Sequence, residues 1–118
     1  DPFPFGGHIT TLESIFMGVP IITLIGDTPF SRVSGSFLNI LGLGEFIAQT
    51  PEEYIHLAIV LAKDPHRLYT LRTTLRERLT SSILCNPQAY MHHLETLYQA
   101  IWTEWCQNKS SVSSGDFE

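Results

Sequence analysis

The stretch GGHITTLESIFMGVPIITLI, residues 6–25, decides the fold of this chain. A glycine pair precedes a short amphipathic segment, which predicts a helix over residues 10–17. Gly18 stands where that helix would end, because glycine tolerates the left-handed conformation that closes many helices. Residues 21–25 are a β-branched run of the kind buried in parallel sheets. Elbow, helix, glycine and buried strand in this order form half of a βαβ unit, so the sequence predicts an α/β fold.

The next segment predicts a second helix and a second strand. Ser31 can cap a helix that runs to about Leu41 and stops at Gly42 or Gly44. Residues 45–48 predict a short edge strand.

From Thr50 onward the pattern is helical. Thr50 and Asp64 are each followed by proline, which predicts two helix starts with the residue before proline as the cap. Pro87 opens a long helix with an aromatic stripe. Residues 107–118 are polar and serine-rich, which predicts a frayed or disordered tail.

Composition excludes several classes of function. The formal charge is −5, and Asp64 and Glu77 share the region of the arginines between residues 67 and 78, so no concentrated basic patch for nucleic acid is predicted. No apolar run reaches the length of about 18 residues expected of a membrane span. Cys85 and Cys106 match no metal or redox spacing, which indicates thiols in a reducing cytoplasm.

The glycine pair at residues 6–7, here called the glycine elbow, and the helix start after it predict an anion site. The elbow allows a bulky anion to approach the backbone, and the first amides of a helix are unsatisfied donors that favour phosphate. Thr10 and Thr11 can add hydroxyl donors or cap the helix, and Glu13 can accept hydrogen bonds from two ribose hydroxyls. Diphosphate plus ribose is a nucleotide-sugar hypothesis. On spacing alone a purely structural elbow, which is common in α/β proteins, is the favoured explanation.

Other polar residues offer weaker candidates. His8 can be a phosphate-facing donor, a general acid or a loop histidine, and Arg32 can point at a ligand or anchor Asp27. His92 and His93 are adjacent on a predicted helix and point about 100° apart, which makes them poor joint ligands. No metal site is predicted.

The chain resembles the C-terminal catalytic region of the O-linked N-acetylglucosamine transferases and their SPINDLY-like bacterial relatives. The likeness covers most of residues 4–105 in the same order. The segments that carry it are residues 4–13, 17–24, 26–27, 31–33, 41–43, 45–48, 53–54 and 94–98, with Trp102.

The resemblance implies a GT-B architecture, in which two Rossmann-like domains face a cleft, often after tetratricopeptide repeats. Such enzymes move N-acetylglucosamine, or in some members fucose, from a nucleotide diphosphate sugar to serine or threonine hydroxyls, with inversion and without a metal. It implies that Gly7, His8, Ile9, Thr10 and Thr11 contact the diphosphate. It assigns no catalytic residue within this chain.

Two positions depart from the family pattern. Ile9 stands where many relatives have threonine, so only its backbone amide can serve the phosphate. Glu13 takes the ribose role with one methylene more than the usual aspartate.

The predicted organisation follows from this resemblance. Residues 1–49 are the C-terminal part of a Rossmann-like donor domain, residues 50–106 a helical segment of the same domain, and residues 107–118 the tail. The expected partners are a donor, UDP-N-acetylglucosamine, a protein or peptide acceptor, and an upstream GT-B domain with tetratricopeptide repeats, but neither nucleic acid nor membrane. A degenerate domain serving as a protein-interaction module, or an unrelated α/β nucleotide-binding domain, are the alternatives.

Overall fold

In the computed structural model, which describes the backbone of residues 1–112 and the side chains of residues 1–108, helix α1 spans Ile9–Phe16. Its end forms a Schellman motif, in which the Val19 N–H donates to the Ser14 carbonyl at 2.8 Å and the Gly18 N–H to the Ile15 carbonyl at 2.9 Å. Gly18 has φ of 76°, and a Cβ there would lie 2.5 Å from the Arg72 carbonyl oxygen. The predicted glycine stop is confirmed.

Two short parallel strands follow the predicted order. Strand β1 (Thr23–Leu24) pairs with β2 (Ile47–Ala48), and Thr23 lies opposite Ile47. The run at residues 21–25 predicted a longer strand. Within residues 1–112 only the two residues of β2 pair with this run, and a segment counts as a strand only where it forms backbone hydrogen bonds with a neighbouring strand. The first part of the predicted strand at residues 45–48 is a turn of 3₁₀ helix, Gly44–Phe46.

Helix α2 (Pro29–Ile40) connects the two strands and completes the βαβ unit. Thr28, and not Ser31 as predicted, is its N-cap, because the Thr28 side chain accepts a hydrogen bond from the Ser31 N–H. The Ser31 hydroxyl is buried and donates to the Thr28 carbonyl at 2.8 Å. The helix ends in a second Schellman motif at Gly42, with φ of 69°.

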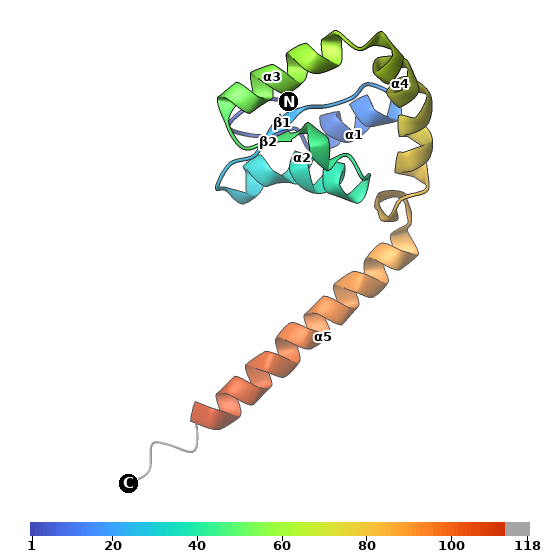
Figure 1. Ribbon diagram of the computed structural model, residues 1–118. Helices are drawn as coiled ribbons and strands as arrows, with labels where there is room; N and C mark the ends of the chain where they lie inside the picture. The colour runs from blue at the N-terminus through green and yellow to red at the C-terminus, as the bar shows by residue number, and fades with distance from the viewer. Residues whose placement is uncertain (113–118) are drawn as a thin grey trace. The chain divides into compact units, whose positions relative to one another are not determined.

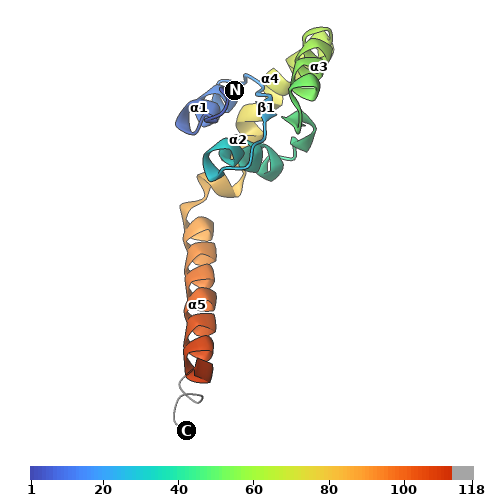
Figure 2. The same cartoon turned by 90° about the vertical axis from the view of Figure 1, so that its left-hand side faces the viewer.

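Helices α3 (Pro51–Ala62) and α4 (Pro65–Thr80) start at the predicted caps, since Thr50 and Asp64 each accept a hydrogen bond from a backbone N–H in the first turn. Figure 1 shows α3 on one side of the strands and α2 on the other. Helix α4 packs against both α1 and α3, and Figure 2 shows α1 beside the α2–β1 layer. The loop after α4 contains a 3₁₀ turn, Ile83–Cys85.

One apolar core joins these elements. Ile15 of α1, Leu38 of α2 and Leu75 of α4 have no exposed surface, so each helix contributes a stripe to the same cluster. The other buried members are Leu41, Leu43, Phe46, Leu61, Leu71 and Leu79.

The chain divides into two compact units, Asp1–Cys85 and a second that begins at Asn86. The sequence predicts residues 50–106 as a helical segment of the same domain as residues 1–49; α3 and α4 contribute to the core of the first unit, and α5 belongs to the second. The second unit contains α5 (Pro87–Val112), so the predicted tail is helical up to Val112; residues 113–118 lie outside the described part. Within that part no helix is long and apolar enough to cross a membrane.

Candidate functional site

Helix α1 begins without a side-chain cap. His8 occupies the N-cap position, and its side chain makes no capping hydrogen bond. Ile9 and Thr10, the next two residues, are exposed. The first N–H groups of a helix have no partner within it and lie at the positive end of its dipole. The start of α1 therefore offers donors to an anion.

Asp1 holds the glycine elbow and the first turn of α1 together. Its Oδ1 accepts a hydrogen bond from the Gly7 N–H at 2.8 Å and a longer one from the Thr11 hydroxyl at 3.4 Å. Thr11 is 2% exposed, and its hydroxyl oxygen lies 3.2 Å from Ser34 Oγ. The Thr11 hydroxyl and the Gly7 N–H are thus engaged inside the protein, unlike the free donors that the sequence suggested.

The elbow is packed tightly enough to require glycine at Gly7. A Cβ on this residue would lie 2.5 Å from Thr11 Oγ1, 2.9 Å from Thr10 Oγ1 and 3.0 Å from Asp1 Oδ1. The requirement is steric and does not come from backbone conformation. Among the described residues the glycines with a positive φ are Gly18 and Gly42, and Gly7 is not one of them. The exposed Thr10 hydroxyl therefore lies over the elbow, where it can donate to a ligand held there.

An aromatic stack stands beside the start of α1. The ring of Phe5 stacks on the His8 imidazole, with centroids 5.3 Å apart, and on the Phe30 ring at 5.4 Å. Phe5 and Phe30 are both more than half exposed. The His8 Nε2 atom is buried and has no hydrogen-bond partner among the residues that the structure describes. Such an atom is rare in native proteins, where a protein group, a water or a ligand satisfies most buried polar atoms.

The stack also brings the start of α2 next to the start of α1. Phe30 is the second residue of α2, and Ser34 Oγ in the next turn donates to the Gly7 carbonyl at 2.8 Å. Two helix starts thus meet beside the segment that follows β1. Arg32 is exposed there and, within residues 1–112, forms no ion pair with Asp27 or another acid.

Glu13 lies about one turn after Ile9 on α1 and lines a separate groove. Glu13 is exposed and lines a groove of about 470 Å³ whose other walls are apolar. None of residues 7–11 lines that groove. Its other lining residues are Leu12, Phe16, Met17 and Leu79.

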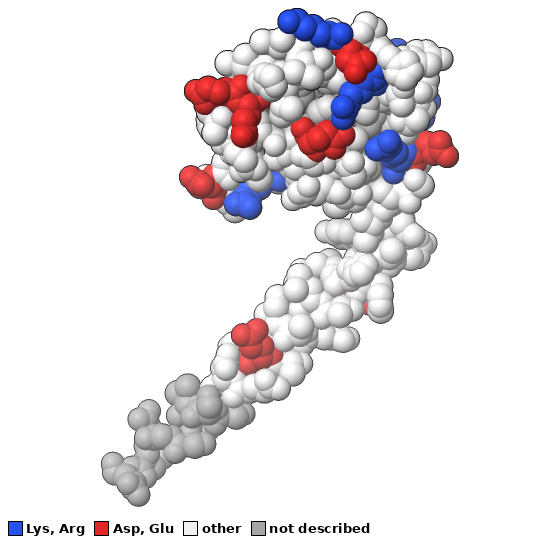
Figure 3. All heavy atoms as spheres, in the orientation of Figure 1, with Lys and Arg blue, Asp and Glu red and all other residues white. Residues whose placement is uncertain are grey.

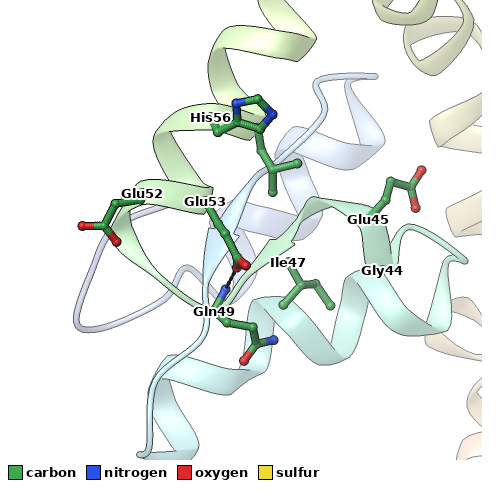
Figure 4. Close-up of a pocket in the computed structure, with 8 residues that line it drawn as sticks. Gly44, Glu45, Ile47, Gln49, Glu52, Glu53 and His56 are labelled. Carbon is green, nitrogen blue, oxygen red and sulfur yellow. Dashed lines mark hydrogen bonds between the residues drawn. The ribbon is translucent and has the colours of Figure 1, made fainter.

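A larger groove of about 580 Å³ lies between α3 and β2 and contains none of the predicted site residues (Figure 4). Two of its acids already have partners: Glu53 Oε2 accepts from the Gln49 N–H at 2.7 Å, and Glu45 pairs with Arg67 at 3.0 Å. We therefore assign no ligand to this groove.

Neither a charged patch nor a set of metal ligands indicates a second site in the described part of the chain. On the face shown in Figure 3, basic and acidic side chains of the first unit are interspersed. Among residues 1–112 no group of three or more His, Cys, Asp or Glu side chains could hold a metal ion.

Sequence reasoning overlooked the polar residues that build the elbow: Asp1, Thr23 and Ser34. Thr23 is 1% exposed in strand β1, and Ser34 is fully buried in helix α2. A hydroxyl in a buried strand or on the inner face of a helix needs a hydrogen-bond partner. The presence of Thr23 and Ser34 in such positions was therefore the sequence signal for a buried polar network.

Parallel strands joined by a helix, with helix starts gathered beside the segment after β1, define an α/β domain of the Rossmann-related class. The family description "Glycosyl transferase family 41" matches residues 2–94. The chain therefore belongs to glycosyl transferase family 41.

Named relatives agree with this assignment. The chain is 39% identical over 110 residues to the "probable UDP-N-acetylglucosamine–peptide N-acetylglucosaminyltransferase SPINDLY" of Hordeum vulgare, covering 93% of this chain and 12% of the barley protein. It is 32% identical over 99 residues to the UDP-N-acetylglucosamine–peptide N-acetylglucosaminyltransferase of Caenorhabditis elegans, covering 84% of this chain and 9% of the relative. The chain thus spans about an eighth or less of these relatives' length.

A solved structure has the same fold. A mutant O-GlcNAc transferase of Thermobaculum terrenum superimposes with a TM-score of 0.81 at 37% identity, over 92% of this chain and 21% of that chain. This match confirms that the chain is an α/β part of a GT-B fold.

Proposed function

We propose that this chain forms one wall of the donor site of an inverting glycosyltransferase. The enzyme moves N-acetylglucosamine, or a related sugar, from a nucleotide diphosphate to serine or threonine hydroxyls of a protein or peptide. Relatives named as UDP-N-acetylglucosamine–peptide N-acetylglucosaminyltransferases support the reaction class and the donor.

The observation that carries the proposal is the buried, unpartnered Nε2 of His8 beside an uncapped helix start. A diphosphate oxygen would accept the Nε2–H and the amides of Ile9 and Thr10, and the exposed Thr10 hydroxyl would add a donor. Gly7 supports the site indirectly: its N–H is bonded to Asp1, and its lack of a side chain leaves room for Thr10 and Thr11 beside the elbow.

The remaining contacts concern the ribose and the second helix. Glu13, about one turn after Ile9 on α1, accepts hydrogen bonds from the ribose hydroxyls. Arg32, exposed at the start of α2, is a secondary contact to the donor.

The rest of the enzyme lies in the other part of the parent protein. We place the base-recognition segment, the catalytic residues and the acceptor-facing domain upstream, together with tetratricopeptide repeats, in a cytoplasmic protein that needs no metal for transfer. This chain alone is therefore expected to be inactive, and transfer by the isolated chain would contradict the proposal.

The test is calorimetric titration of the full-length protein with uridine diphosphate and, in parallel, guanosine diphosphate. His8→Phe keeps a ring on Phe5 but removes Nε2, and we expect the affinity for the preferred diphosphate to fall about tenfold, as loss of a charge-assisted hydrogen bond predicts. His56→Phe, an exposed histidine on α3, is the matched control and should bind as the wild type does.

Two results would overturn these assignments. Equal affinity of His8→Phe and wild type would remove the phosphate role of His8. Unchanged affinity of Glu13→Ala would remove the ribose role of Glu13.

The two departures from the family pattern, Ile9 and Glu13, favour one alternative: a degenerate domain retained as a protein-interaction or regulatory module. Weak uridine diphosphate binding by the full-length protein, with neither hydrolysis nor transfer to any acceptor peptide, would support this alternative.

A further inference from the structure

We infer that Asp1 is a positioning residue of the donor site, whose carboxylate holds the glycine elbow and the start of α1 in the conformation that receives the diphosphate. This inference rests on the proposed function. Asp1 acts on the ligand through the elbow, because both of its carboxylate oxygens are engaged by protein donors.

The carboxylate of Asp1 ties together three elements that meet at the site. Oδ1 accepts from the Gly7 N–H at 2.8 Å and from the Thr11 hydroxyl of α1 at 3.4 Å, while Oδ2 accepts from the Thr23 hydroxyl of β1 at 2.8 Å. Ser34 of α2 closes the network, since its Oγ donates to the Gly7 carbonyl at 2.8 Å and lies 3.2 Å from Thr11 Oγ1.

The network is sheltered from water. Thr11, Thr23 and Ser34 are at most 2% exposed, and Asp1 is partly buried. Each hydroxyl therefore needs its protein partner, because a buried hydroxyl without one costs free energy. Both peptide groups of Gly7 are fixed in this way, its N–H by Asp1 and its carbonyl by Ser34.

An anchored elbow matters for anion binding for two physical reasons. Two adjacent glycines have the largest backbone entropy to lose, so an elbow without an anchor would lose this entropy on binding the diphosphate. A site held in its binding conformation beforehand avoids that loss.

The charge of Asp1 works in the opposite direction. A carboxylate beside an anion site repels the anion, so the benefit of Asp1 has to lie in geometry. Asparagine supplies the same geometry without the charge: its Oδ1 can accept from Gly7, and the Thr23 hydroxyl can turn to accept from Nδ2. Alanine supplies neither.

These points separate positioning from other roles. In the full-length protein we expect Asp1→Ala to weaken uridine diphosphate binding about tenfold or more. Asp1→Asn should bind at least as tightly as the wild type. Thr23→Val, which keeps the buried shape and removes only the hydroxyl, should give an intermediate loss.

Hydrogen–deuterium exchange measured without ligand provides a second readout. The peptide that contains Gly7 should exchange faster in Asp1→Ala and at the wild-type rate in Asp1→Asn. Asp64→Ala is the matched control, because Asp64 is also a carboxylate that accepts a backbone N–H, from Arg67 at 2.9 Å, at the start of α4. It should leave both uridine diphosphate binding and exchange at Gly7 unchanged.

The outcomes distinguish the inference from the proposed function. Failure of the wild type to bind uridine and guanosine diphosphates would overturn the proposed function, whatever the exchange shows. Wild-type affinity or wild-type exchange in Asp1→Ala would overturn the positioning role alone. A loss of binding in Asp1→Asn as large as in Asp1→Ala would also overturn it, because the charge rather than the geometry would then be required.

Discussion

Replacing Gly7 with alanine places a methyl group in the most crowded part of the elbow. The new Cβ would lie 2.5 Å from Thr11 Oγ1 and 3.0 Å from Asp1 Oδ1, where ordinary contact begins at 3.4 Å. Thr11 is held by Ser34 and Asp1 by Thr23, so neither side chain can turn away without breaking another hydrogen bond. The backbone has to move, and the 2.8 Å bond from the Gly7 N–H to Asp1 lengthens.

The magnitude follows from three contributions. Overpacking of a tight site costs about 1–3 kcal/mol, and weakening a hydrogen bond to a charged group costs about 1.5 kcal/mol or more. The smaller unfolded-state entropy of alanine returns about 0.4–1 kcal/mol. We expect Gly7→Ala to lower the free energy of unfolding by about 1.5–4 kcal/mol. For a unit of this size this lowers the melting temperature by about 10 °C or more.

The assay is thermal and urea unfolding of the chain, followed by circular dichroism. Gly35→Ala is the matched control, since Gly35 is a buried glycine inside α2 whose Cβ would meet nothing closer than Ile25 Cδ1 at 3.6 Å. The higher helix propensity of alanine should make that variant more stable by up to about 1 kcal/mol. A Gly7→Ala variant whose free energy of unfolding equals that of the wild type, or equals or exceeds that of Gly35→Ala, would refute the steric argument.

Three further predictions concern other parts of the chain. Arg76→Ala should cost about 1–2 kcal/mol in urea unfolding, because its Nε donates to the Phe16 carbonyl at 2.8 Å and its guanidinium lies over the Phe16 ring at 4.5 Å; a change below about 0.3 kcal/mol would contradict this. Glu45→Gln should cost less than about 1 kcal/mol and less still in high salt, because the pair with Arg67 is about half exposed; a cost independent of salt would be unexpected. The chain should self-associate in light scattering through the exposed aromatic face of α5, and Trp102→Glu should reduce this; a monodisperse wild-type monomer would exclude it.

The self-association prediction depends on the surface of α5 alone. Between Pro87 and Asn108 this helix has no Lys or Arg, and much of its surface in Figure 3 is uncharged. Tyr98 and Trp102 are each more than 60% exposed, and the rings of Trp102 and Trp105 stack at 5.1 Å. So large an apolar surface on one helix is typical of a contact with another polypeptide segment.

The network around Asp1 changes how the first turn of α1 contributes to a ligand site. Thr10 and Thr11 are neighbours in sequence and were equivalent hydroxyl candidates there. In the structure Thr10 is exposed, while Thr11 is buried against Ser34. Their different roles follow from helix geometry, because successive side chains point about 100° apart and only one of them can face the core.

Much of this fold was predictable because its signals are local. A cap followed by proline fixes a helix start through hydrogen bonds within one turn, and Thr50 and Asp64 both behave as predicted. Glycine closes a helix through its own backbone conformation, as Gly18 and Gly42 do. Two predictions were wrong, for different reasons. Thr28 rather than Ser31 caps α2, although Thr28 followed by Pro29 is the same local signal as at Thr50 and Asp64. The strand predicted over residues 21–25 is short because its hydrogen bonds depend on a partner strand that is distant in sequence.

By itself, the sequence determined the order of elements, their helix caps and the family resemblance, since these are encoded in residues close together along the chain. Only the tertiary structure decided which polar groups face a ligand. Asp1, Thr23 and Ser34 are separated by 10 or more residues, yet their hydrogen bonds at 2.8 Å hold Gly7 and occupy its N–H. Such hydrogen bonds depend on how strands and helices pack in three dimensions, and the spacing of residues along the chain does not determine that packing.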